Sequence, residues 1–315
     1  MYERIFVPLD GTDVAEAAIP FAELIPSRRV RLLQVDPITV TVRQSPAGME
    51  RLKKAQEDRV SRASAYLAQQ AEGLRRQGRD VELIAEAGDP RERIVAATRD
   101  ADLVVIGTRG RNVGGRTFGA SIADHVLRNT DAPTLLVRAA LSQAAPVVAR
   151  VVVPLDGSDL AESALPAAIR LSRLLGVRPH LARVVPASRH PIDIDAMRQE
   201  AAAYLDAQVM QLTAVDLSAT RAVLEGPIGS TLLEAILPTD LVVMTAHGAG
   251  GEHRAPLGRV ATRIVAEAEA PVLLLHLRHP PAAIDRASER TRSRERVGTG
   301  ESPPDRPGAD MRSGS

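Results

Sequence analysis

Residues 5–18 read IFVPLDGTDVAEAA, and the chain repeats this stretch as VVVPLDGSDLAESA at residues 151–164. The apolar start, the Pro-Leu-Asp-Gly centre and the Ala-Glu end all recur. The two stretches begin 146 residues apart, a spacing much longer than the roughly 20–50 residues of a solenoid unit. The pattern therefore predicts two copies of one domain in a single chain.

Segments near the end of each copy correspond as well. They pair ADLVVIGTRG (101–110) with TDLVVMTAHG (239–248), and DAPTLLVR (131–138) with EAPVLLLH (269–276). The two copies thus match from their first apolar run to their last. We expect the first domain at residues 1–140, a linker at 141–149 and the second domain at 150–278.

Within each copy, short apolar runs alternate with amphipathic segments. A continuous apolar run is typical of a strand that is buried on both faces of a parallel sheet. The alternation predicts two doubly wound α/β domains, each with five parallel strands and helices on both faces. In the first copy, the expected strands are 5–9, 30–35, 81–87, 103–107 and 134–137, and the expected helices lie near 13–25, 50–77, 90–99 and 120–129.

The first helix of each copy has a recognisable start. Asp13 with Glu16, and Asp159 with Glu162, fit a helix N-cap followed three residues later by an acidic partner. We therefore expect Asp13 and Asp159 to cap these helices.

The end of the chain, residues 279–315, has a different composition. Pro, Ser, Gly and charged residues of both signs dominate it, and apolar residues are nearly absent. Such a segment buries too little apolar surface to fold, so the sequence predicts a disordered tail. Because acidic residues nearly match the arginines, a solvated tail is favoured over an arm that binds nucleic acid.

Composition narrows the class of protein. The 315 residues suit two domains, and 44% hydrophobic with 25% charged residues is typical of a globular protein. A net charge of +1 argues against nucleic acid or anionic membranes as partners. Without cysteine there is no disulfide or zinc-thiolate site, and the seven histidines lack metal-ligand spacing. With no leader-like start and no apolar run of about 20 residues, we expect a cytoplasmic protein.

A glycine-rich stretch, IGTRGRNVGGRTFGAS (106–121), lies between a predicted strand and a predicted helix. Ligands collect at the carboxyl ends of parallel strands, and the N-terminus of a helix favours an anion. Ser121 can cap that helix, with Asp124 three residues later. The stretch is either a cradle for phosphate, with its arginines neutralising charge, or a flexible connector.

The first strand of each copy ends in VPLDG[ST], which places Asp10 and Asp156 at a carboxyl end. Each aspartate either forms a turn with the following glycine or accepts a hydrogen bond from the ribose or base of a ligand. No Walker A motif, dinucleotide fingerprint or GxSxG motif is present. The sequence therefore indicates binding rather than catalysis.

Together, these motifs resemble the universal stress protein (UspA-like) family. The resemblance rests on VPLDG[ST]xxAExA, on GTRG followed after nine residues by AS, and on APTLLVR as the closing strand. It covers both copies, about residues 1–278, and therefore suggests a tandem two-domain member. It implies a doubly wound α/β fold related to adenine-nucleotide α-hydrolase-like domains.

The resemblance also implies a nucleotide site in the first domain. Some family members bind ATP through a G-x₂-G-x₉-G-[ST] pattern, whereas others lack the pattern and bind no nucleotide. Ala120 stands where the third glycine would be, and its methyl group is acceptable only if the backbone need not approach the phosphates closely. The residues carried over by this match are Pro8, Asp10, Val35, Gly107, Gly110, Arg111, Ala120, Ser121 and Ile122.

The second copy departs further from the family pattern. Thr245 replaces the first glycine and Arg259 replaces the hydroxyl residue, while Glu252 and Pro256 lie in the loop. An acid beside phosphate is unfavourable, and proline lacks an N–H donor. The corresponding residues are Pro154, Asp156, Val184, Gly248, Gly258 and Arg259. We therefore expect nucleotide binding mainly in the first domain.

Three functions follow from this resemblance. The first is a stress-response or signalling module that binds ATP, accompanied by Mg²⁺, without turnover. The second is a nucleotide-free interaction or structural protein of the same fold, and the third is a weak ATPase. The family commonly pairs domains through the last strands, so residues 134–137 and 272–277 are expected to join the copies as an internal pseudo-dimer. Further association into a homo-oligomer is left open.

Overall fold

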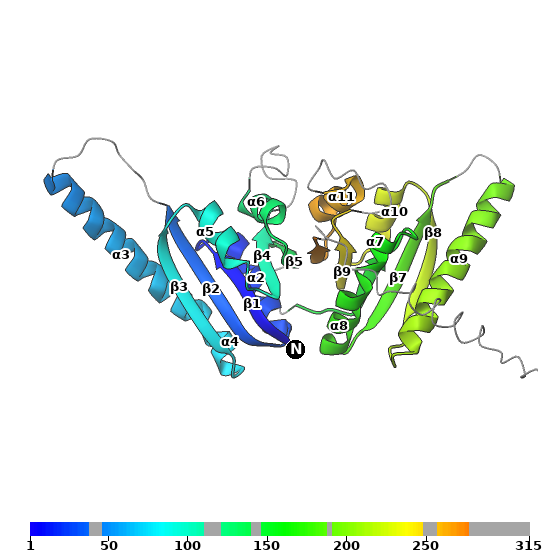
Figure 1. Cartoon of the computed structure of the whole chain (residues 1–315), viewed down its shortest axis with the longest axis horizontal. Coiled ribbons are helices and arrows are strands. Elements are labelled where there is room, and N and C mark those ends of the chain that lie inside the picture. The colour runs from blue at the N-terminus through cyan, green and yellow to red at the C-terminus, as the bar shows by residue number, and fades with distance from the viewer. Residues whose placement is uncertain (38–45, 110–120, 140–145, 188–190, 248–256, 277–315) are drawn as a thin grey trace, which may run out of the picture. The chain divides into compact units, whose positions relative to one another are not determined.

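The computed structural model describes residues 1–37, 46–109, 121–139, 146–187, 191–247 and 257–276. These residues form a ten-stranded sheet with helices on both faces (Figure 1). The strand order is β3-β2-β1-β4-β5-β10-β9-β6-β7-β8. None of the described helices is long and apolar enough to cross a membrane. The α/β fold expected from the sequence is confirmed.

The first copy supplies five parallel strands in the order β3-β2-β1-β4-β5. All five lie where the apolar runs predict them. The strands are β1 (Tyr2–Leu9), β2 (Ser27–Pro37), β3 (Asp80–Gly88), β4 (Leu103–Thr108) and β5 (Thr134–Arg138). The helices are α1 (Asp13–Glu16), α2 (Ala18–Leu24), α3 (Pro46–Gln70), α4 (Glu72–Arg76), α5 (Pro90–Ala97) and α6 (Ile122–Asn129).

The second copy repeats this order as β8-β7-β6-β9-β10, again with parallel pairing. Its strands are β6 (Arg150–Pro154), β7 (Arg178–Val185), β8 (Thr220–Glu225), β9 (Asp240–Thr245) and β10 (Val272–Leu275). Its helices are α7 (Asp159–Glu162), α8 (Leu165–Leu175), α9 (Pro191–Thr213), α10 (Ile228–Ala235) and α11 (Arg259–Glu267). The sequence repeat is therefore a repeat of structure.

The two copies meet at β5 and β10, which pair antiparallel with Leu135 opposite Leu273. This confirms the expected seam. Arg138, at the end of β5, donates hydrogen bonds from Nη1 to the carbonyl oxygens of Glu267 (3.1 Å) and Ala268 (2.9 Å), where α11 ends. A guanidinium at the negative end of a helix dipole is favourable.

The core lies on both faces of the sheet, because side chains alternate along each strand. In β1, Val7 belongs to the cluster under α2 and α3, whereas Phe6 belongs to the cluster under α5 and α6. The long helices α3 and α9 lie along β2–β3 and β7–β8 (Figure 1). With aromatic residues at only 2%, Val, Leu, Ile and Ala supply most of the buried side chains.

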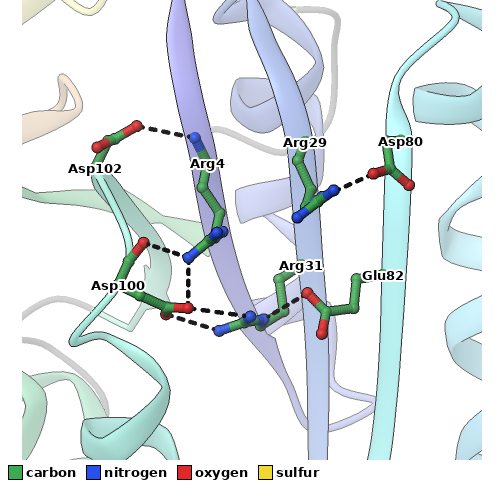
Figure 2. Close-up of polar contacts among 7 residues, drawn as sticks. All are labelled: Arg4, Arg29, Arg31, Asp80, Glu82, Asp100 and Asp102. Carbon is green, nitrogen blue, oxygen red and sulfur yellow. Dashed lines mark hydrogen bonds and ion pairs between the residues drawn. The ribbon is translucent and has the colours of Figure 1, made fainter.

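Ion pairs lie along the amino-terminal halves of β1, β2 and β3. Arg31 donates to Glu82 (2.8 Å) and to Asp100 (2.8 Å), and Asp100 also pairs with Arg4. Two backbone N–H groups, of Glu3 and Arg4, donate to Asp102. Figure 2 shows this network, whose members are Arg4, Arg29, Arg31, Asp80, Glu82, Asp100 and Asp102.

The first helix of each copy begins one residue earlier than the sequence predicts. The helix caps are Thr12 and Ser158, not Asp13 and Asp159, because each hydroxyl accepts the N–H three residues later and the aspartates are already helical. The predicted disordered tail, residues 279–315, and residues 141–145 of the predicted linker lie outside the described residues.

Candidate functional site

The predicted site lies at the carboxyl ends of β1, β2 and β4. Strand β1 lies between the other two, and the strand order reverses between β1 and β4. Crevices at such reversals are the usual ligand sites of open parallel sheets. Asp10 follows β1, Val35 is buried near the end of β2, and Gly107 is the penultimate residue of β4. The structure thus brings these three predicted residues to one edge, where Pro8 is buried in β1.

Asp10 and Gly11 form a tight turn at this edge. Oδ1 of Asp10 accepts hydrogen bonds from the backbone N–H (3.0 Å) and the hydroxyl (2.6 Å) of Thr12. Gly11 has a φ of 78°, which a residue with a Cβ rarely adopts. The turn interpretation of Asp10 is therefore confirmed. Oδ2 has no hydrogen-bond partner among the described residues, so one carboxylate oxygen remains available for a ligand.

The second copy contains the same turn. Asp156 accepts from the N–H (3.0 Å) and hydroxyl (2.6 Å) of Ser158, and Gly157 has a φ of 87°. Pro154 ends β6, and Val184 is half-buried in β7. The two copies thus position their aspartates in the same way.

Gly107 has a structural reason to be glycine. A Cβ on this residue would overlap the carbonyl oxygen of Val14 and lie 2.7 Å from its carbonyl carbon. Helix α1 therefore packs directly against the backbone of β4. In the second copy Thr245 stands here, buried, and its hydroxyl donates to the carbonyl of His247. The close approach that glycine permits here is therefore made by α1.

Helix α6 begins beside this edge. Ser121 is its N-cap, and its hydroxyl oxygen accepts from the N–H of Asp124 (3.1 Å), as predicted. Asp124 is buried and pairs with Arg128 at 2.7 Å. Ile122 is the first helical residue. The remaining N–H groups of the first turn and the helix dipole favour an anion.

Helix α11 begins differently. Its N-cap is Gly258, which has no side chain to cap it, and the Gly258 N–H donates to the carbonyl of Ala246 (2.8 Å). Arg259 is exposed and has no hydrogen-bond or ion-pair partner in the described part of the chain. Four predicted site residues, Gly110, Arg111, Ala120 and Gly248, lie outside the described residues.

Two tyrosines border the turns. The Tyr66 hydroxyl on α3 donates to Glu16 (2.9 Å), and the Tyr204 hydroxyl on α9 donates to Glu162 (3.0 Å). Burial, together with Glu16 and Asp10, raises the pKa of Tyr66, so its phenol stays protonated. Sequence reasoning missed these pairs. The signal was present in the repeat, because SRASAYL (61–67) and QEAAAYL (199–205) correspond.

The described residues contain no group of three or more His, Cys, Asp or Glu side chains that could hold a metal ion. A divalent cation at this edge would therefore rely on Asp10 or Asp156 and on groups of its own ligand.

Comparisons with known proteins agree with the fold. The model of the Universal stress protein family matches residues 1–138 and again 148–276. A universal stress protein of Mycobacterium tuberculosis is 25% identical over 317 residues, which cover 88% of this chain and 96% of that protein. The solved universal stress protein of Archaeoglobus fulgidus has a TM-score of 0.61 at 18% identity and covers 87% of this chain and 98% of its own. A solved Pseudomonas aeruginosa structure is similar at a TM-score of 0.58, with 15% identity and coverage of 87% and 93%.

Proposed function

The chain belongs to the universal stress protein family, and we propose that its first domain binds ATP or a related adenine nucleotide. The binding serves a cytoplasmic stress-response or signalling role, carried out by residues 1–140 and 150–278 as two domains. The observation that carries the proposal is the Asp10–Gly11 turn. It fixes one carboxylate oxygen at the carboxyl end of β1 and leaves Oδ2 without a partner among the described residues.

The residues at this edge suit the chemistry of a nucleotide. Oδ2 of Asp10 would accept a ribose hydroxyl, and buried Val35 offers an apolar surface for the sugar or base. The first turn of α6, with Ser121 at its cap, would receive phosphate. Gly110, Arg111 and Ala120 precede that turn in sequence and complete the proposed site. Mg²⁺ would bind together with the nucleotide, coordinated by its phosphates.

A nucleotide-free interaction protein is the second candidate. The packing of α1 against Gly107 favours it, because that contact explains one glycine of the motif without any ligand. The first candidate predicts that the chain binds ATP, and the second predicts that it does not.

Equilibrium dialysis of the full chain with labelled ATP tests the proposal. We expect saturable binding in the wild type, and at least about tenfold weaker binding in Asp10→Asn. The asparagine retains Oδ1 for the turn but removes the negative charge. Asp13→Asn is the matched control, since Asp13 is exposed three residues away and no described residue pairs with it. Absence of saturable binding at millimolar ATP would favour the nucleotide-free candidate.

A further inference from the structure

A cleft of about 490 Å³ lies at the amino-terminal edge of the first domain, opposite the edge proposed for nucleotide. Its walls come from the loop before β4, the loop before β5 and Arg170 of α8. Helix α5 ends in the first loop with Thr98 as its C-cap, and α6 ends in the second loop with Thr130 as its C-cap. The negative ends of both helix dipoles therefore border the cleft, and such ends favour a cation.

Among the described residues, two aspartates line the cleft beside these helix ends. They are Asp102, whose carboxylate accepts two backbone N–H groups of β1 (Figure 2), and exposed Asp131. Arg170 brings a positive charge, but its Cζ lies 3.9 Å from the ring centroid of Tyr2, over the face of that ring. Arg99, which also lines the cleft, is exposed to solvent. Carboxylates and helix carbonyls thus offer acceptors for a further donor.

The corresponding place in the second copy already holds an arginine. Arg138, at the end of β5, donates from Nη1 to the carbonyl oxygens of Glu267 and Ala268, where α11 ends. The repeat places Asn129 and Thr130, which line the cleft, at the same positions in the first copy. The first copy thus reaches across the seam to cover a helix end of the second copy.

The second copy leaves its last strand beside the cleft. Strand β10 runs antiparallel to β5, and Leu274 pairs with Thr134. The residues after Leu274 therefore run back alongside Pro133 and Ala132, both of which line the cleft. The chain that follows β10 begins next to the cleft.

The first arginine after β10 is Arg278. The repeat matches Arg138 with His276, and Arg278 stands two residues further along the chain. Residues two apart lie on the same side of an extended chain, and each residue spans up to about 3.6 Å, so the Arg278 side chain can reach the cleft. A guanidinium has five N–H donors in one plane, which suits carboxylates and the carbonyls of a helix end.

We propose that residues 277–282 dock in this cleft, with Arg278 as the counterpart of Arg138. Each copy then supplies an arginine that covers a helix end of the other copy across the seam of β5 and β10. The partner of the cleft is this chain's own segment, recognised by two helix ends and two carboxylates. The inference is independent of the proposed function, because the nucleotide belongs to the opposite edge of the sheet.

The distance between two spin labels in the intact chain tests the docking. The sequence has no cysteine, so Ala96→Cys, exposed near the end of α5, and Ala282→Cys supply the only labelling sites. Two prolines directly before Ala282 restrict the chain between this label and Arg278. We expect one narrow distance distribution in this labelled chain and a broad one after Arg278→Glu. Arg286→Glu is the matched control, because it makes the same change of charge outside the docked segment.

Each outcome bears on the proposal. Loss of the narrow distribution in Arg278→Glu alone, with an unchanged circular dichroism spectrum, supports it. A broad distribution before any change at Arg278 overturns the docking and assigns the cleft to another occupant. A narrow distribution that survives Arg278→Glu overturns the role of Arg278. Equal broadening by Arg286→Glu also overturns it, because the attraction would then be one of general charge.

Discussion

At the scale of single residues, Gly107 and Gly11 are glycines for different structural reasons. Gly107 lies against the backbone of α1, whereas Gly11 adopts a positive φ and has no atom of another described element within 4 Å of its Cβ position. A pattern of glycines in a sequence does not distinguish these roles. The structure does, because it shows what a Cβ would meet.

Gly107→Ala is expected to destabilise the protein by about 1–3 kcal/mol, since the methyl group would press on the Val14 carbonyl and shift α1. Urea unfolding measures the change. Gly73→Ala is the control: it lies in α4 and its Cβ would meet only the end of the Glu23 side chain, which can move. An equal loss in both variants would contradict the close packing of α1.

At the scale of elements, the N-terminus of α6 combines a structural and a proposed binding role. Ser121→Ala removes the cap and is expected to cost about 1 kcal/mol. Ser121→Asp keeps a cap and suits the helix dipole, so stability is retained, but its negative charge opposes phosphate. Thermal unfolding and ATP titration should therefore separate the two variants. Full ATP affinity in Ser121→Asp would place the phosphates elsewhere.

The ion-pair network of Figure 2 is predicted to contribute less to the stability of the fold at acid pH. Burial acts to raise the pKa of Asp100, but Arg31 and Arg4 outweigh it and hold the pKa below the ordinary 3.8. A carboxyl group whose pKa is lowered by folding stabilises the folded state fully at pH values above its ordinary pKa. This stabilisation is lost as the pH falls through the lowered pKa of the folded state.

Asp100→Asn is accordingly expected to cost up to about 1 kcal/mol near neutral pH, a small value because the side chain is half exposed. The cost should shrink as pH falls below about 4, as urea unfolding across pH would show. Asp58→Asn, exposed on α3 with no partner among the described residues, serves as the control. A cost that does not depend on pH would rule out the ionic explanation.

Most elements could be predicted because their signals are local. The apolar runs located all five strands of the first copy, and Ser121 was correctly predicted as a cap. The predicted caps lie one residue after the observed caps, Thr12 and Ser158. In the DG[ST]D motif both the hydroxyl residue and the aspartate that follows it are good N-caps, so the sequence does not choose between them. The Tyr66–Glu16 and Tyr204–Glu162 pairs join helices distant in sequence, and periodicity within a segment carries no information about them.

At the scale of the whole molecule, both hydrophobic clusters contain residues from both copies, and β5 pairs with β10. A protease site inserted between residues 140 and 146 should therefore leave two halves that remain associated after cleavage. Size-exclusion chromatography at micromolar concentration measures this. Halves that separate at once would contradict a shared core.

Arg138→Ala should weaken the association of the cleaved halves by about 1–3 kcal/mol, because two carbonyls at the end of α11 lose their donor. Arg75→Ala, exposed on α4, is the control. Equal dissociation constants for both variants would show that the contact contributes nothing to the seam.

The seam at β5 and β10 has a genetic consequence. In a dimer of identical chains, one codon change alters both subunits, and the two sites stay equal. Here Gly107 and Thr245 are encoded separately, although they occupy matching places. Substitutions can therefore accumulate at this edge in one copy without changing the other copy, while β5 and β10 still pair.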